Sequence, residues 1–132
     1  MTTIVRRNPP ELHTTPGYHH LTLTPDTAFL AGQCPLDQSG ALVGDGDVLA
    51  QVDQVVDNIM TALADAGLTP ADVVKTVIYV VTPAQGVLGS VWARLQDSPL
   101  APAFTSASTL LGVAALGFTG QLVEIDVTAV RS

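Results

Sequence analysis

The sequence predicts one α+β domain over residues 1–132, in which two helices cover one face of a mixed sheet of about six strands. Three observations support this prediction. Residues 121–131 alternate strictly between apolar and polar side chains, residues 47–66 repeat apolar side chains at helical spacing, and residues 73–81 form a β-branched run. A chain of 132 residues is long enough for one hydrophobic core and too short for two typical ones.

Three strands are expected in the first third of the chain, over residues 2–7, 18–24 and 27–31. Pro9-Pro10 ends the first strand, Pro16-Gly17 precedes the second, and Pro25-Asp26 joins the second and third as a hairpin. The polar, glycine-rich residues 37–47 indicate a loop.

Residues 47–66 give the clearest helix, with an apolar stripe formed by Leu49, Val52, Val56, Ile59, Met60 and Leu63. Asp45 or Asp47 can cap its start, and Gly67 stands where a C-terminal cap glycine belongs. Thr69 and Asp72 have the spacing of a capping box, which predicts one short helical turn.

Residues 73–81 are predicted to form a central strand covered on both faces, because the run is β-branched and almost uninterrupted. A second helix is expected from Thr82 to Leu95, although Gly86 and Gly89 weaken it by about 1 kcal/mol each. Residues 99–102 are expected to interrupt regular secondary structure. Residues 103–111 are expected to form a strand and residues 112–120 a loop.

In the last strand, Val123, Ile125, Val127 and Ala129 face one way, and Leu122, Glu124, Asp126 and Thr128 face the other. Two helices can cover only the first of these faces, so the second must meet water or another subunit. A solvated face explains the two carboxylates, whereas a subunit contact would place Glu124 in a pocket. The composition, 47% hydrophobic and 13% charged, favours the subunit.

Charge and composition exclude several classes of function. The net charge is −7 and the five Lys and Arg residues are scattered, so we expect neither nucleic-acid binding nor attachment to an acidic membrane. No apolar run reaches the length of a membrane span, and the N-terminus lacks a signal-peptide core. The single cysteine fits a reducing cytoplasm.

Several motifs resemble the Rid/YjgF family of reactive-intermediate deaminases over almost the whole chain. They are Gly17-Tyr18, Ala31-Gly-Gln-Cys-Pro-Leu-Asp37, Val73-Val-Lys-Thr-Val77, Pro102-Ala103 and Val123-Glu-Ile-Asp-Val-Thr-Ala-Val-Arg131. The resemblance implies a chorismate-mutase-like fold and a homotrimer whose sheets form a central barrel, with pockets between subunits. It also implies hydrolysis of imines and enamines, such as 2-iminobutanoate and 2-iminopropanoate, without a cofactor.

The family's site residues are transferred one by one. Tyr18 and Glu124 match the family's tyrosine and its strand glutamate, which handles the water, and Gly89 matches a position where only the backbone is used. Ala31, next to Gly32, replaces a serine, and Phe104 replaces the arginine that grips the substrate carboxylate. Thr105 and Ser106 keep small hydroxyls nearby. Because phenylalanine cannot bind a carboxylate, the resemblance implies a less charged, more apolar or aromatic ligand.

Other candidate residues allow more than one interpretation of their role. Cys34 follows the Gly-Gln segment and is either a nucleophile near the pocket or an inert small hydrophobe. Trp92 belongs to the core of the second helix or reaches an intersubunit pocket. His19 and His20 are adjacent and would face opposite ways in a strand, and His13 lies in a loop, so no metal site is expected. Asp126 is expected to be structural.

Three functional hypotheses follow. The first is a trimer that acts on a small imine, enamine or carbonyl metabolite through Glu124 and Tyr18, with Phe104 shaping the pocket. The second is a non-catalytic trimer that senses a ligand or binds a partner. The third is retained deamination of 2-imino acids, with the carboxylate held by backbone amides or by another residue. Older family labels mention ribonuclease activity, against which the acidic charge argues.

Overall fold

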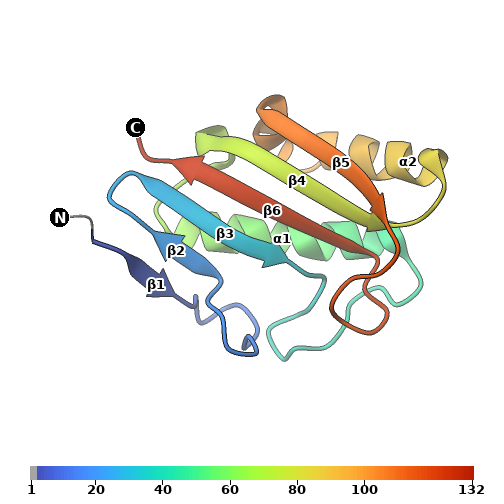
Figure 1. Cartoon of the computed structure of the whole chain (residues 1–132), viewed down its shortest axis with the longest axis horizontal. Coiled ribbons are helices and arrows are strands. Elements are labelled where there is room, and N and C mark those ends of the chain that lie inside the picture. The colour runs from blue at the N-terminus through green and yellow to red at the C-terminus, as the bar shows by residue number, and fades with distance from the viewer. Residues whose placement is uncertain (1–2) are drawn as a thin grey trace.

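The computed structural model describes residues 3–132 as one six-stranded mixed sheet with two α-helices (Figure 1). The elements in chain order are β1 (Val5–Arg7), β2 (Leu21–Leu23), β3 (Thr27–Gln33), α1 (Val48–Asp65), η1 (Pro70–Asp72), β4 (Val73–Val81), α2 (Gln85–Gln96), η2 (Ala101–Thr105), β5 (Ala107–Val113) and β6 (Val123–Val130). The strand order is β1-β2-β3-β6-β4-β5. The predicted α+β class is therefore confirmed.

The last strand of the chain lies in the middle of the sheet. β6 pairs antiparallel with β3 on one side and with β4 on the other, and only β4 and β5 run parallel. This placement makes β6 the strand against which both halves of the sheet are built.

Both helices pack on the same face of the sheet, behind the strands in Figure 1. The predicted alternation of β6 is confirmed, since Val123, Ile125, Val127 and Ala129 are at most 1% exposed beneath the helices. In the middle of the sheet, the core continues through Ile78 and Val80 of β4.

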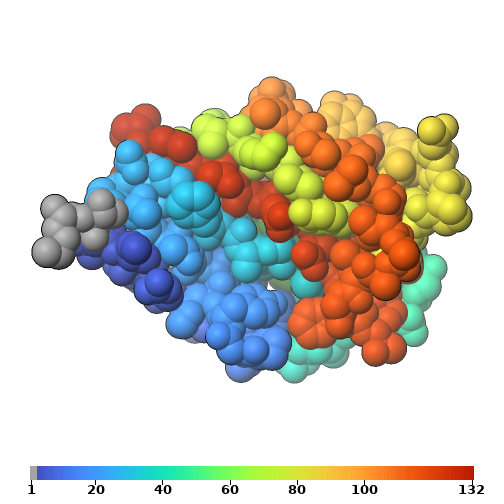
Figure 2. Space-filling model, viewed as in Figure 1, coloured from blue at the N-terminus to red at the C-terminus, as the bar shows by residue number. Residues whose placement is uncertain are grey.

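Within residues 3–132 of a single chain, no helix covers the opposite face of the sheet (Figure 2). Large apolar side chains remain exposed on its strands, with Phe29 of β3 46% exposed, Val74 of β4 47% and Leu111 of β5 42%. The prediction that residues 73–81 are covered on both faces is therefore wrong for one chain. The β-branched run reflects one buried face and one apolar, uncovered face, which we call the open face.

The prediction of a strand from residue 103 is also wrong. Residues 101–105 form the 3₁₀ turn η2, with a proline in its first turn, and β5 begins at Ala107. The hydroxyls of Thr105 and Ser106 donate to the carbonyls of Pro102 and Ala103, at 2.7 and 2.6 Å. Such local side-chain bonds favour a turn over an extended strand.

The remaining elements differ from the predictions mainly at their ends. β2 and α2 are shorter than expected, because the chain before Leu21 is irregular and α2 begins only after Pro83. β3 runs two residues further than expected, and residue 2 of the first predicted strand lies outside the described residues. Asp47 caps α1, its carboxylate accepting from the Ala50 amide at 3.1 Å.

Two buried amide side chains on α1 hold the segments that flank β3 and β6. Gln51 donates to the carbonyls of Gly44 and Gly120 and accepts from the Leu122 amide at 2.7 Å. Asn58 donates to the carbonyls of Cys34 and Leu36, both at 2.9 Å. Because buried backbone groups must find partners, these bonds fix the end of β3 and the start of β6.

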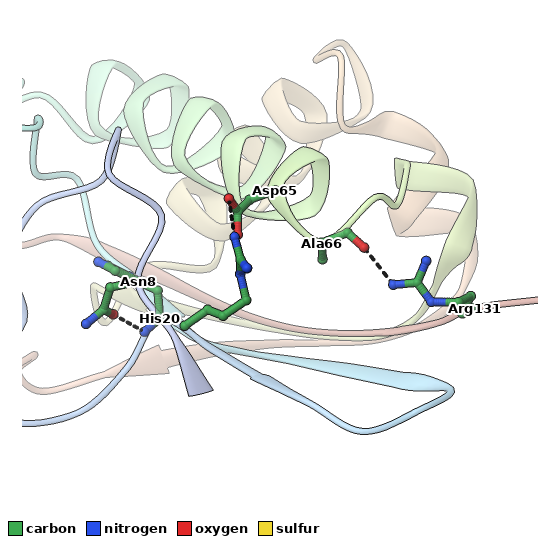
Figure 3. A network of polar contacts seen from close by, with 6 residues as sticks. Asn8, His20, Asp65, Ala66 and Arg131 are labelled. Atoms are coloured by element: carbon green, nitrogen blue, oxygen red, sulfur yellow. Dashed lines mark hydrogen bonds and ion pairs between the residues drawn. The ribbon is translucent and has the colours of Figure 1, made fainter. Parts of the chain in front are cut away.

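The outer edges of the fold are tied by three more polar contacts (Figure 3). The Arg7 guanidinium binds the Asp65 carboxylate at 2.9 and 3.0 Å, and Arg131 donates to the Ala66 carbonyl at 2.7 Å. The His20 amide donates to Asn8 at 2.9 Å. None of the helices formed by residues 3–132 is long and apolar enough to cross a membrane.

Candidate functional site

A cavity of about 460 Å³ lies where β3 ends and β6 begins. The loop before β2 and the loop before β6 close its sides. Its lining residues are Pro16, Tyr18, Ala31, Gly32, Cys34, Gly117, Phe118 and Glu124. Five of the residues predicted from the sequence therefore meet in one place: Tyr18, Ala31, Gly32, Cys34 and Glu124. We call it the Glu124 cavity.

Glu124 occupies the space that a side chain at position 32 would need. A Cβ added to Gly32 would lie 2.2 Å from Oε2 of Glu124 and 2.9 Å from Oδ1 of Asp126. A side chain at position 32 would therefore push the Glu124 carboxylate out of its present position. The same geometry brings Glu124 and Asp126 side by side above one backbone position.

Two hydrogen bonds hold one oxygen of the Glu124 carboxylate. Oε1 accepts from the Cys34 thiol at 3.4 Å and from Nε2 of Gln121 at 3.2 Å. Oε1 of Gln121 also accepts a hydrogen bond from the backbone amide of Phe118 at 3.1 Å. One buried side chain therefore connects Glu124 to the wall of the cavity. No residue among 3–132 donates a hydrogen bond to Oε2, which leaves this oxygen as a free acceptor.

Cys34 is buried and holds its proton strongly. Burial and, second, the neighbouring Glu124 carboxylate together raise the pKa of the thiol from 9.0 to about 12. A thiolate is the nucleophilic form of cysteine, so this environment opposes nucleophilic catalysis. The geometry supports a different role, in which the thiol donates to Glu124 and orients it.

Asp126 is bound to the sheet itself. Its Oδ2 accepts from the Tyr79 hydroxyl at 3.0 Å, across the β4–β6 pair, and this bond raises the pKa of Tyr79. The structural role predicted for Asp126 agrees with this contact.

Tyr18 stands at the mouth of the cavity and is 39% exposed. Partial burial raises the pKa of its hydroxyl, and Cys34 and Glu124 add to the effect. Tyr18 therefore remains a neutral phenol that can donate a hydrogen bond to a ligand.

A buried histidine cluster supports the cavity from behind. Gln33 donates to the Ala31 carbonyl at 3.0 Å and lies 3.2 Å from Nδ1 of His20. The His20 ring is 4.7 Å from that of His13, whose pKa is lowered first by burial and then by His20. Both ring nitrogens of His13 lack a partner among residues 3–132.

The other predicted site residues are not at this cavity in one chain. Phe104 is 5% exposed and packs edge-on against Trp92, at 5.9 Å between ring centroids, on the helical side of the sheet. Thr105 and Ser106 bond to the backbone of η2. Gly89 lies on the exposed surface of α2.

No residue near Phe104 on η2 or β5 can replace the missing arginine. Residues 101–113, from η2 to the end of β5, contain no Lys or Arg, so no register of this segment supplies one. The side chains of β5 that share the face of Tyr79 and Val77 come from Leu111 and Thr109. Both are uncharged.

The roles of Gln121 and Phe118 at the cavity are not predicted by the sequence, which indicates the start of a strand at Gln121 and a loop at Phe118. A signal was present for Gln121, since it is an amide two residues before Val123, which enters the core. Nothing in the local sequence indicates that Phe118 folds back over the cavity.

A second cavity, of about 310 Å³, lies between α1 and α2 and is lined by acidic residues, including Asp57 and Asp97, beside the ion pair of Arg94 and Asp53. It contains none of the predicted site residues. Across residues 3–132, no three His, Cys, Asp or Glu side chains are arranged to hold a metal ion.

Comparisons with known proteins place the chain among relatives of the same fold. The family described as Endoribonuclease L-PSP matches residues 10–131. Protein DfrA of Myxococcus xanthus is 34% identical over 104 residues, which cover 77% of this chain and 74% of DfrA. A RutC family protein of Pyrococcus abyssi is 39% identical over 51 residues, 39% of this chain and only 40% of its own length.

A solved structure from Yersinia pestis shows the same architecture. It is a protein of unknown function, YyfB, of the conserved Rid protein family, and it is 32% identical to this chain. The superposition covers 97% of this chain and 98% of YyfB, with a TM-score of 0.71.

The close approach of Glu124 to Gly32 generates a stability prediction. Gly32→Ala should lower the free energy of unfolding by about 1–3 kcal/mol in urea denaturation, because the new methyl group displaces Glu124 from Cys34 and Gln121. Gly86→Ala is the control, since its Cβ would have no neighbour within 4 Å and should stabilise α2 by up to about 1 kcal/mol. Equal stability of wild type and Gly32→Ala would contradict the described packing.

The raised pKa of Cys34 generates a second prediction. At pH 8, a pKa near 12 rather than 9.0 leaves roughly a thousandfold less thiolate. Alkylation by iodoacetamide should therefore be at least about 100-fold slower in the folded protein than in urea, and Glu124→Gln should accelerate it. The thiol binds its proton more tightly in the folded protein than in the unfolded chain. The contribution of Cys34 to the free energy of unfolding is therefore complete below pH 9 and is lost as the pH rises towards 12. Equal rates in folded and unfolded protein would contradict this account.

Proposed function

The chain belongs to the endoribonuclease L-PSP family, to which Rid/YjgF proteins belong, and we propose that it hydrolyses a small imine or enamine at the Glu124 cavity. The observation that carries the proposal is the carboxylate of Glu124, fixed through one oxygen by Cys34 and Gln121 and free at the other. A positioned carboxylate with a free oxygen suits proton transfer to and from water.

The proposed reaction converts a protonated imine and water into a carbonyl compound and ammonium. Glu124 takes a proton from water as the hydroxide oxygen bonds to the imine carbon, and the C=N π electrons become a lone pair on nitrogen. Glu124 returns that proton to nitrogen. It then accepts the hydroxyl proton as the C–N bond breaks, and the departing ammonia leaves with the bonding electrons and takes up this proton.

Tyr18 has a supporting role in this scheme. Its neutral hydroxyl can donate a hydrogen bond to the oxygen of the intermediate, and its position at the mouth of the cavity would limit the entry of water. Cys34 keeps Glu124 in place and forms no covalent bond to the substrate. The proposed chemistry needs no cofactor.

We also propose that the chain is a homotrimer in which the open faces form a central barrel. Exposed Phe29, Val74 and Leu111 favour burial of this face by further copies, because exposed apolar side chains gain stability when removed from water. Gly89, Trp92, Phe104, Thr105 and Ser106 remain candidates only for a part of the cavity that lies between subunits. A cytoplasmic location stays a prediction from the sequence.

A second candidate function is a trimer that binds its ligand without catalysis. It is favoured by the lack of a Lys or Arg in residues 101–113, where the resemblance places the substrate-binding arginine. Ribonuclease activity is not proposed, since a net charge of −7 opposes binding of a polyanion.

Imine hydrolysis by wild type and Glu124→Gln separates these functions. An imine generated in situ should decay faster with the wild-type protein than in buffer, and Glu124→Gln should lower the added rate by at least about 100-fold, the usual loss when a general base is removed. Asp57→Asn, on the helical side, is the control and should leave the rate unchanged. Full activity of Glu124→Gln would contradict the mechanism, and absence of any added rate would favour ligand binding.

A further inference from the structure

The Glu124 cavity carries negative charge and no basic residue. Glu124 is the only carboxylic acid among its eight lining residues, and none of the eight is Lys, Arg or His. Asp126 adds a second carboxylate, because Oδ1 of Asp126 and Oε2 of Glu124 both lie within 3 Å of one point above Gly32. Neither carboxylate has an ion pair with any residue from 3 to 132.

Three of the chain's five basic residues are already engaged on the helical side of the sheet. Arg7 binds Asp65, Arg94 binds Asp53, and Arg131 donates to the backbone at the end of α1. Their guanidinium groups are thus held away from the cavity.

The other two basic residues lie elsewhere on the sheet. Lys75 pairs with Thr128, four residues along β6 from Glu124, which corresponds to about 13 Å. Arg6 is on β1, three strands away from β6, or roughly 14 Å. Neither residue forms an ion pair with Glu124 or Asp126 among residues 3–132.

The walls of the cavity suit a cation with an apolar body. Tyr18 and Phe118 enter its lining from the loops before β2 and before β6, and the faces of aromatic rings attract positive charge. Pro16, Ala31 and Gly117 add apolar or small surfaces. The free Oε2 of Glu124 can accept a hydrogen bond from a charged nitrogen, which is among the stronger hydrogen bonds in proteins.

We propose that the Glu124 cavity selects ligands that carry a protonated imine or amine nitrogen on an apolar or aromatic body and that lack a carboxylate. The N–H of the ligand donates to Oε2 of Glu124, and its body packs between Tyr18 and Phe118. A 2-imino acid would bring its own carboxylate next to two others with no cation to balance it. The catalytic part of this inference rests on the proposed imine hydrolysis, whereas the binding part does not.

Binding is tested with two ligands that share a phenylalkyl body and differ in charge: phenethylamine and 3-phenylpropanoate. Titration calorimetry of the wild-type protein should show the amine binding at least about 10-fold more tightly, with the difference shrinking as salt screens the charges. Glu124→Gln should weaken amine binding by at least about 10-fold. Asp57→Asn, at the acidic cavity between the helices, should leave it unchanged. Equal or tighter binding of 3-phenylpropanoate would overturn the proposal.

Hydrolysis is tested with the matched imines. Oxidation of phenethylamine by an amine oxidase gives an imine without a carboxylate, and oxidation of phenylalanine by an amino-acid oxidase gives the corresponding 2-imino acid. The first should be hydrolysed at least about 10-fold faster than the second, relative to buffer. Faster decay of the 2-imino acid would overturn this inference and leave imine hydrolysis standing. Tight amine binding without hydrolysis of either imine would support the inference and overturn the proposed function.

Discussion

The placement of the Glu124 carboxylate above Gly32 is the constraint on which the site depends. Because Oε2 of Glu124 lies 2.2 Å from where a Cβ at position 32 would be, a side chain at this point of β3 would displace the carboxylate. The register between β3 and β6 shifts between Leu30 and Gln33, and the shift brings Gly32 under the carboxylate. Buried amides on α1 then hold the flanking segments, so that a helix on one face of the sheet determines the position of an acid on the other.

The uncovered face of the sheet gives the fold its second constraint. Two helices bury one side of six strands, and the other side presents Phe29 and Leu111 together with Glu124 and Asp126. A surface that combines apolar side chains with two carboxylates lacking an ion-pair partner among residues 3–132 is costly to leave in water and costly to bury without a balancing charge. Association with further copies and a positively charged ligand would together resolve both costs.

Much of this arrangement could be predicted from the sequence, because periodicity reports which face of an element is buried. The alternation in β6 gave the buried set from Val123 to Ala129, and the β-branched run gave the bounds of β4. The resemblance brought Tyr18, Gly32 and Glu124 to one site. The 3₁₀ turn that contains Phe104 was not predicted, because the side-chain hydroxyls of Thr105 and Ser106 stabilise it and a strand pattern cannot indicate such bonds. Gln121 and Phe118 depend on contacts between distant segments, which a local pattern does not contain.

The most direct test of the account is a crystal structure of the assembled protein with phenethylamine bound. We expect the ammonium nitrogen within hydrogen-bond distance of Oε2 of Glu124, the phenyl ring between Tyr18 and Phe118, and the open faces of several copies in contact. A lysine or arginine of another copy paired with Glu124, with the amine outside the cavity, would contradict it.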